Sequence, residues 1–280
     1  MSIGLRQEIK QEVKPEPKLE LKRKLPRVIA LVNQKGGVGK TTSTINLGAG
    51  LAKQKKRVLL VDLDPQGNLT YSLGIEAHSL DKTIYEILKD EIKAKDAIIS
   101  KNGLDIIPAS INLSGAEIEL SGTAGRELLL KEAFSGLIKD YDYILLDCPP
   151  SLSLLTLNGL TTATEVYIPL QTEFLALQGM SKLLQTIDII KKRLNSELEI
   201  TGIIGTLYDS RKKLNKEVID KIKEHFSDKL FTSLIRDNIS LAEAPSYGQD
   251  IFTYKKDSNG AEDYLALSKE VIKQEGGDNE

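Results

Sequence analysis

The sequence predicts a doubly wound α/β fold, with a mostly parallel β-sheet and helices on both of its faces. Short runs rich in Val, Ile and Leu alternate with longer helical patterns, and such alternation is typical of parallel sheets. The apolar runs are also nearly continuous, with few polar residues among them. Continuous apolar strands are expected where helices cover a sheet on both faces.

Each element is expected from its own segment of this pattern. The expected strands are 27–33, 57–64, 104–109, 141–150, 165–171 and 199–209. The expected helices are 40–54, 126–138, 178–194, 213–226 and 261–274. Because no repeat and no convincing boundary interrupts the alternation, residues 27–274 are expected to form one domain.

The two ends of the chain differ from this domain. Residues 1–26 mix Lys with Glu, include Pro15 and Pro17, and carry only isolated apolar residues. Such a segment buries too little surface to offset its chain entropy, so we expect a disordered charged tail. An arm that contacts a partner or DNA is the alternative, because residues 1–27 carry a net charge of +4. Residues 275–280 are expected to form a flexible C-terminal tail.

The composition excludes several classes of site. Cys148 is the only cysteine and there are two histidines in 280 residues, which excludes an intrachain disulfide and a Cys/His metal site. The formal net charge of −2 means that any DNA binding needs a local basic patch. The sequence has no apolar stretch typical of a signal peptide or a membrane span. We therefore expect a cytoplasmic protein without a membrane partner.

The first expected strand runs into a glycine-rich turn and a helix, with the sequence VNQKGGVGKTT at 32–42. Glycines let backbone amides converge on phosphate oxygens, and a helix N-terminus favours an anion. Lys40 is expected to reach the β- and γ-phosphates, and the Thr41 hydroxyl to ligate Mg²⁺. A dinucleotide-binding turn would need glycine where Thr42 stands. The expected nucleotide-binding residues here are Gly36, Gly37, Val38, Gly39, Lys40, Thr41 and Thr42.

Carboxylates follow two other expected strands. Asp62 and Asp64 end the second, and period-2 alternation places them on the same side, near the γ-phosphate. Asp147 ends the strongly apolar run at 143–147, where a carboxylate can orient the hydration shell of Mg²⁺. The alternative for the first pair is that both aspartates only cap the strand end.

The phosphate loop departs from the usual pattern, because Gln34 replaces its first glycine and Lys35 adds a second lysine. This form resembles the deviant Walker A motif of the ParA/MinD ATPases. The resemblance implies that Lys35 reaches ATP phosphates across a dimer interface; a solvated lysine is the alternative. It also implies that Asp64, in VDLDPQGN, positions the attacking water, and that Asp62 holds the loop and the Mg²⁺ shell. The implied catalytic set is Lys35, Lys40 and Asp64, and the implied metal set is Thr41, Asp62 and Asp147.

Further segments, LQGMSKLLQTI and LAEAPSYGQ, are similar to those of the ParA/Soj DNA-partitioning ATPases. The resemblance implies ATP and Mg²⁺ as cofactors, a homodimer on ATP binding, nonspecific double-stranded DNA as ligand, and a ParB-like partner that stimulates hydrolysis. Asn238 is expected near the adenine. Arg236 stands where the family usually has proline, and Ser240 where it has a DNA-binding arginine. The candidate DNA-binding residues are Arg211, Lys212, Lys213 and Arg236.

Two alternatives and one exclusion accompany this hypothesis. A MinD-like membrane-positioning ATPase needs a basic amphipathic C-terminal helix, whereas residues 273–280 are acidic and contain glycine. A ParA-like ATPase that positions a cargo other than DNA stays open, because ATP motifs do not report the cargo. A metal-cluster ATPase is excluded because a single cysteine supplies no cluster ligand set.

Overall fold

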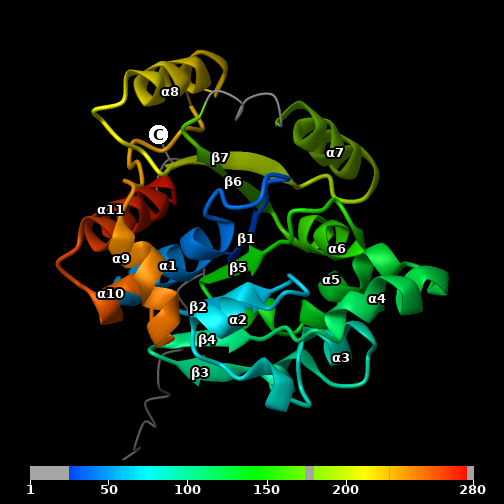
Figure 1. Cartoon of the computed structure of the whole chain (residues 1–280). Coiled ribbons are helices and arrows are strands. Elements are labelled where there is room, and N and C mark those ends of the chain that lie inside the picture. The colour runs from blue at the N-terminus through cyan, green and yellow to red at the C-terminus, as the bar shows by residue number, and fades with distance from the viewer. Residues whose placement is uncertain (1–24, 174–179, 227, 276–280) are drawn as a thin grey trace, which may run out of the picture.

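The structure is a computed structural model, which describes residues 25–173, 180–226 and 228–275. Its centre is a seven-stranded sheet with the order β3-β4-β2-β5-β1-β6-β7 (Figure 1). All neighbouring strands are parallel except β3 and β4. The strands are β1 (Arg27–Leu31), β2 (Val58–Asp62), β3 (Ile99–Lys101), β4 (Leu104–Ile107), β5 (Tyr143–Asp147), β6 (Glu165–Gln171) and β7 (Glu199–Thr206). The predicted doubly wound, mostly parallel fold is confirmed.

One layer of helices covers the first face of the sheet. Apolar side chains of these helices share a core with alternate residues of the strands, among them Ile29 and Leu60. The layer consists of α1 (Lys40–Lys53), α2 (Asn68–Ser72), α9 (Ile239–Glu243), α10 (Ile251–Tyr254) and α11 (Asn259–Gln274).

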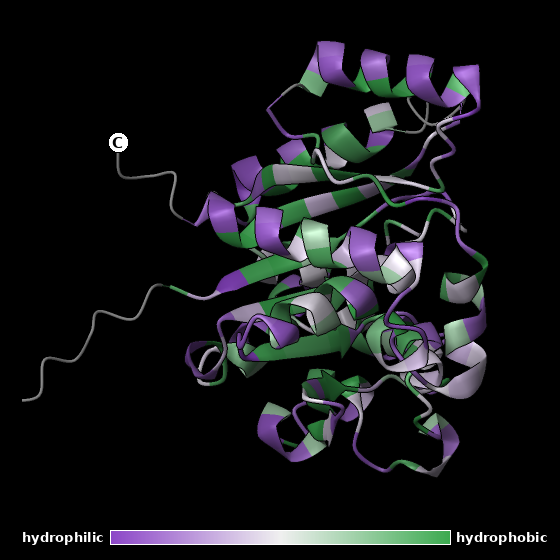
Figure 2. Cartoon of the chain, turned by 90° about the vertical axis from the view of Figure 1, so that its left-hand side faces the viewer, coloured by the Kyte–Doolittle hydropathy of each residue, from purple (hydrophilic) through white to green (hydrophobic). Residues whose placement is uncertain are grey.

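A second layer covers the opposite face, with a core that includes Val28 and Leu59. It consists of α3 (Ile84–Leu88), α4 (Leu113–Glu119), α5 (Leu129–Phe134), α6 (Leu154–Thr162), α7 (Met180–Arg193) and α8 (Lys213–Phe226). Figure 2 shows apolar strands between helices whose outer turns are hydrophilic. Residues adjacent in a strand therefore belong to different cores, which explains why the strands are apolar throughout.

The structure also contains elements that the pattern did not predict. Strand β3 is three residues long and joins β4 through Asn102 and Gly103, which have φ of 52° and 78°. Two central residues with positive φ are typical of a tight hairpin turn. Helix α6 is buried along most of its length, so no polar face reveals its period. The predicted tails lie almost entirely outside the described residues, and the predicted domain limits stay a prediction.

Candidate functional site

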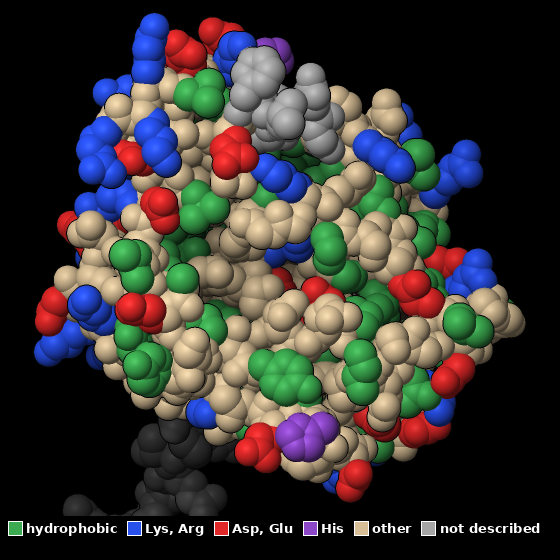
Figure 3. Space-filling view, viewed as in Figure 1, with side chains coloured by type: hydrophobic (Ala, Val, Ile, Leu, Met, Phe, Trp, Pro, Cys, Tyr) green, Lys and Arg blue, Asp and Glu red, His purple; other side chains and the backbone are tan. Residues whose placement is uncertain are grey.

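A pocket of about 490 Å³ opens beyond the carboxyl ends of the parallel strands. In open α/β sheets, ligands bind at this edge. Figure 3 shows a hollow near the middle of the corresponding face, with acidic and basic side chains inside it. Segments far apart in the chain form its wall: Gly36, Gly37, Gly39, Lys40, Thr41, Thr42, Asp64, Asn68, Pro150, Thr206, Leu207, Ile235, Arg236, Asp237, Asn238, Ile239, Leu241, Ala242 and Tyr264.

The glycine-rich loop forms one end of this pocket. Gly37 and Gly39 have φ of 72° and 85°, a left-handed region that residues with a side chain rarely adopt. Gly39 also caps the N-terminus of α1, so the first amides of that helix face the pocket. The loop is held from β7, where the Thr206 hydroxyl donates to the Val38 carbonyl at 2.8 Å. The backbone is therefore arranged as an anion cradle before any ligand binds.

Lys40 extends over this loop, and its ammonium donates to the Lys35 carbonyl at 3.3 Å. The residue is only 8% exposed. Burial lowers the pKa of Lys40, while Asp147 and Asp64 oppose that shift. A bound phosphate would favour the charged form of the Lys40 ammonium and replace the water that burial removes from it.

Asp147, at the end of β5, is completely buried and is held by two hydroxyls of α1. Thr41 Oγ1 donates to one carboxylate oxygen at 2.7 Å, and Thr44 Oγ1 donates to the other at 3.2 Å. The pKa of Asp147 is raised, first because of burial and then because of the nearby Asp62. Asp147 therefore lies behind Thr41 and does not itself line the pocket.

Asp62, at the end of β2, is the register partner of Asp147. One of its oxygens accepts the Asp64 N–H at 3.1 Å, and the other accepts the Thr70 N–H at 2.9 Å and the Thr70 hydroxyl at 2.7 Å. Burial is the main reason that its pKa is raised. Asp62 thus holds the 62–70 loop from inside.

Of the two aspartates in this motif, only Asp64 lines the pocket. The alternation of side-chain direction expected along a strand does not extend to Asp64, because β2 ends at Asp62 and the chain then turns. The Asp64 carboxylate accepts the Gln66 N–H at 2.9 Å, which fixes its direction. Asn68, which the sequence analysis did not single out, stands beside it in the wall.

The charges of this site suit a magnesium ion. Two buried carboxylates with raised pKa values, Asp62 and Asp147, are register partners on neighbouring strands, and Asp147 accepts the Thr41 hydroxyl; a divalent cation would relieve the repulsion between the carboxylates. The part of the chain that the structure describes contains no group of three or more His, Cys, Asp and Glu side chains that could hold a metal. Phosphate oxygens and water would have to complete the shell, which is how Mg²⁺ is usually bound at nucleotide sites.

Lys35 points elsewhere. Its ammonium contacts Gln171, the last residue of β6, at 3.2 Å, and Glu173, two residues later, at 2.9 Å. The side chain is 44% exposed and does not line the pocket of its own chain. The two lysines of the motif therefore have different environments.

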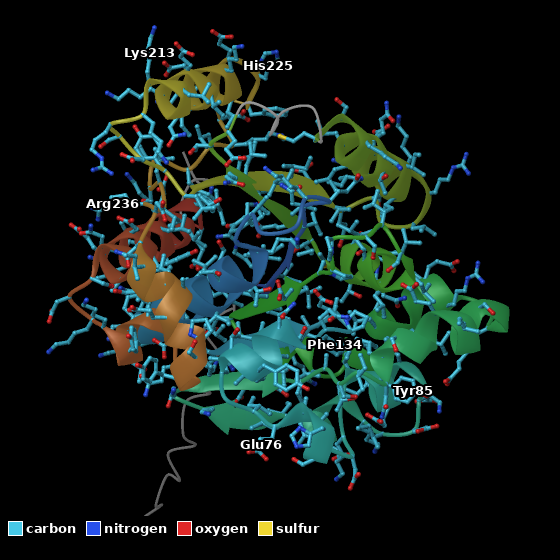
Figure 4. All side chains as sticks on the ribbon, in the orientation of Figure 1. Glu76, Tyr85, Phe134, Lys213, His225 and Arg236 are labelled. Carbon is cyan, nitrogen blue, oxygen red and sulfur yellow. The ribbon has the colours of Figure 1, made fainter. Side chains whose placement is uncertain are left out.

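The opposite end of the pocket includes two of the predicted residues. Asn238 caps α9 by accepting the Ser240 N–H at 3.0 Å and lines the wall. Arg236, labelled in Figure 4, also lines the wall. Its guanidinium is paired with Asp263 and Glu262. Tyr264 lies close by in α11, and neither its type nor its spacing in the sequence indicated a site. Thr206 could have been found, because it ends a parallel strand.

Of the candidate basic residues, Lys213 begins α8, and Arg211 and Lys212 directly precede it. Both oxygens of Asp209 accept hydrogen bonds from the guanidinium of Arg211 at 2.9 Å. The two lysines line a second hollow, which shares Leu207 and Asp237 with the main pocket.

None of the helices in the part of the chain that the structure describes is both long and apolar enough to cross a bilayer.

Comparisons with known proteins give the family. The model of the AAA domain family matches residues 26–200. Soj, the sporulation initiation inhibitor protein of Bacillus subtilis, is 50% identical over 247 residues, covering 88% of this chain and 98% of the relative. The chromosome partitioning protein ParA of Caulobacter vibrioides is 45% identical over 253 residues, covering 89% of this chain and 95% of the relative.

A similar solved structure, with a TM-score of 0.80 and 38% identity, carries bound ADP and magnesium. The structure is named cobyrinic acid a,c-diamide synthase of Mycobacterium smegmatis. The match covers 90% of this chain and 96% of the synthase chain. Its name differs from those of the sequence relatives, which match this chain at higher identity. The phosphate loop, the buried carboxylates and these relatives agree: the chain belongs to the ParA/Soj family of partitioning ATPases.

Proposed function

We propose that this ATPase moves or positions a chromosome or plasmid by cycling between ATP-bound and ATP-free states. Mg-ATP binds in the main pocket and drives a sandwich homodimer. The dimer binds double-stranded DNA without sequence preference, and a ParB-like partner stimulates hydrolysis and release. The names of the relatives, a sporulation inhibitor Soj and a chromosome partitioning ParA, support this assignment of cargo. On this proposal the protein works in the cytoplasm, on the nucleoid.

The residues of the pocket divide the chemistry among them. The amides of 36–42 and the Lys40 ammonium bind the phosphates, and Asn238 lies at the end where the adenine would be placed. Mg²⁺ bound with ATP supplies charge neutralisation and an ordered hydration shell. Thr41 would ligate the ion, and Asp147 would hold that hydroxyl and a water. Asp64 would position the attacking water, while Asp62 keeps the Asp64 loop in place.

The observation that carries the dimer proposal is the direction of Lys35. A lysine that belonged to its own phosphate cradle would point into the pocket, as Lys40 does. Lys35 instead lies at the surface, paired with Glu173 and Gln171. A cation there can reach phosphates of a second subunit, where it would neutralise charge that develops during phosphoryl transfer.

The start of α8 supplies the proposed DNA contacts. Lys213, labelled in Figure 4, is 92% exposed and Lys212 is 60% exposed, and their ion pairs with Glu217 and Asp209 are long, at 3.5 Å and 4.0 Å, so both can turn toward phosphates. Arg211 is exposed but already paired with Asp209, and Arg236 is paired with two carboxylates. The two lysines are therefore the stronger candidates, and the two arginines of the predicted set stay secondary. Few contacts per subunit imply that binding needs both subunits of a dimer.

Binding of the Asp64→Ala protein to nonspecific duplex DNA tests the proposal. The measurement compares ATP, ADP and no nucleotide over a salt series. We expect binding in the presence of ATP and not with ADP or without nucleotide. The logarithm of the binding constant should fall linearly with the logarithm of the salt concentration, with a slope of about −0.9 for each phosphate contacted. Equal binding in all three states would contradict the nucleotide switch. Absence of binding in every state would contradict DNA as the cargo.

A further inference from the structure

We propose that Asp263 is a positioning residue for nucleotide binding, which fixes the base end of the pocket through Arg236. The proposal rests on the assignment of the main pocket to ATP. Asp263 does not line the pocket, whereas Arg236 does. Any effect of Asp263 on a nucleotide must therefore act through the segment that Arg236 belongs to.

That segment, 235–239, is a wall of the pocket with little regular structure of its own. It contacts the chain just after β7 through a short bridge, in which the Tyr208 backbone N–H donates to the Ile235 carbonyl at 3.0 Å and the Asp237 backbone N–H donates to the Tyr208 carbonyl at 3.1 Å. Arg236, between these two bonds, directs its own N–H away from β7 and toward α11. The wall is thus held from two sides.

On the α11 side, Asp263 holds both the backbone and the side chain of Arg236. Its Oδ2 accepts the Arg236 backbone N–H at 2.9 Å. The guanidinium donates to Oδ1 through Nε at 2.9 Å and through a terminal nitrogen at 2.6 Å. Asp263 is 8% exposed while the Arg236 side chain is 39% exposed, so it is the carboxylate of this pair that is shielded from solvent. Charged, two-point bonds of this kind are directional as well as strong.

Glu262 contacts the same guanidinium at 2.6 Å but has a different environment. Its side chain is 74% exposed, and it makes no bond to the Arg236 backbone. An exposed ion pair contributes little to structure. Glu262 is therefore a matched control: a neighbouring carboxylate with the same partner, without the buried contact.

The next residue of α11, Tyr264, lines the pocket and also contacts α1, the helix that follows the phosphate loop. The Tyr264 hydroxyl is hydrogen-bonded to the buried Ser43 Oγ at 3.0 Å. Neighbouring residues of α11 thus contact the base end of the pocket and the helix behind the phosphate end separately. Loss of Asp263 should loosen the base end and leave the phosphate end intact.

The experiment uses two ligands that separate these ends. ATP needs both, whereas inorganic tripolyphosphate needs only the phosphate cradle. For Asp263→Ala we expect affinity for Mg-ATP to fall about tenfold, the order expected when a charged hydrogen-bond partner is removed. Affinity for tripolyphosphate should be unchanged, and Glu262→Ala should change neither ligand more than about twofold. In turnover assays the KM for ATP should rise while kcat stays constant.

Further variants keep the test decisive. Arg236→Gln should show the same loss confined to ATP, and adding Asp263→Ala to it should cause little further loss. If Asp263→Ala does not fold, Asp263→Asn, which keeps the volume, takes its place. Equal losses for both ligands, or no loss for ATP, would overturn the positioning role. Lys40→Ala reports separately on the pocket: unchanged ATP binding in that variant would refute the ATP assignment itself.

Discussion

Thr70→Val removes one buried hydroxyl from the network behind Asp64, and the structure allows its cost to be worked out. The Thr70 hydroxyl donates to Asp62 at 2.7 Å and accepts the Ala109 N–H at 3.0 Å. Valine has nearly the same shape, so the change removes these two bonds without leaving a cavity. A hydrogen bond to a charged group contributes about 1.5–3 kcal/mol, and an orphaned buried N–H costs about 1–3 kcal/mol. Because the Thr70 N–H still contacts Asp62, we expect a total loss of about 3 kcal/mol.

Urea unfolding of the nucleotide-free protein at pH 8 measures this loss. Thr70→Ser keeps the hydroxyl and removes a methyl group, so it should cost only about 1 kcal/mol. The structure also predicts a functional effect, because the loop that Asp62 holds carries Asp64. We expect kcat for ATP to fall in Thr70→Val, with a smaller change in KM.

The loss should depend on pH. Burial raises the pKa of Asp62, and the Thr70 hydroxyl opposes that shift. A raised pKa means that the folded state keeps a proton that the unfolded state releases, so stability falls as the pH rises from about 4 through the folded pKa. Without the hydroxyl the folded pKa rises further, and the deficit should be larger at pH 8 than at pH 5. A Thr70→Val protein within about 0.5 kcal/mol of the wild type at pH 8 would refute this reasoning.

Three other substitutions test the site. Lys40→Ala should abolish ATP binding measured by calorimetry, because it removes the ammonium from the cradle; wild-type affinity would contradict its role. Glu173→Gln should strengthen ATP-dependent dimerisation by up to about fivefold, since releasing Lys35 from an exposed ion pair gains at most about 1 kcal/mol; weaker dimerisation in light scattering would count against this. Lys213→Ala should reduce DNA affinity more than Arg211→Ala, because Lys213 has only a 3.5 Å ion pair with Glu217 whereas Arg211 donates two 2.9 Å hydrogen bonds to Asp209, and equal effects would argue against that ranking.

The central strands and the phosphate loop could be predicted because their signals are local. An apolar run such as 143–147 encodes a strand covered on both faces, whatever it packs against. The glycines at 37 and 39 are required by the backbone angles of the turn itself. Likewise, Asp147 follows its strand directly, so its position at the ligand edge follows from the direction of the strand.

Local signals failed where an element depends on its surroundings. Helix α6 has no polar face, so its periodicity is hidden, and short helices such as α2 contain too few residues to show one. The role of Asp62 also depended on context. Its spacing from Asp64 suggested that both side chains point to the same side of the strand. The turn after β2 instead places the Asp62 carboxylate inside the loop and the Asp64 carboxylate in the pocket.

By itself the sequence determined the fold class, the phosphate cradle and the resemblance to the ParA/Soj ATPases, because each depends on residues that are contiguous in the chain. Only the tertiary structure decided how the rest of the pocket is closed. Arg236 could be recognised as basic, but its partner Asp263 lies 27 residues later on α11. Tyr264 reaches Ser43 across 221 residues. Such pairs form only when α11 packs against α1 and the segment after β7, and a one-dimensional pattern carries no record of that contact.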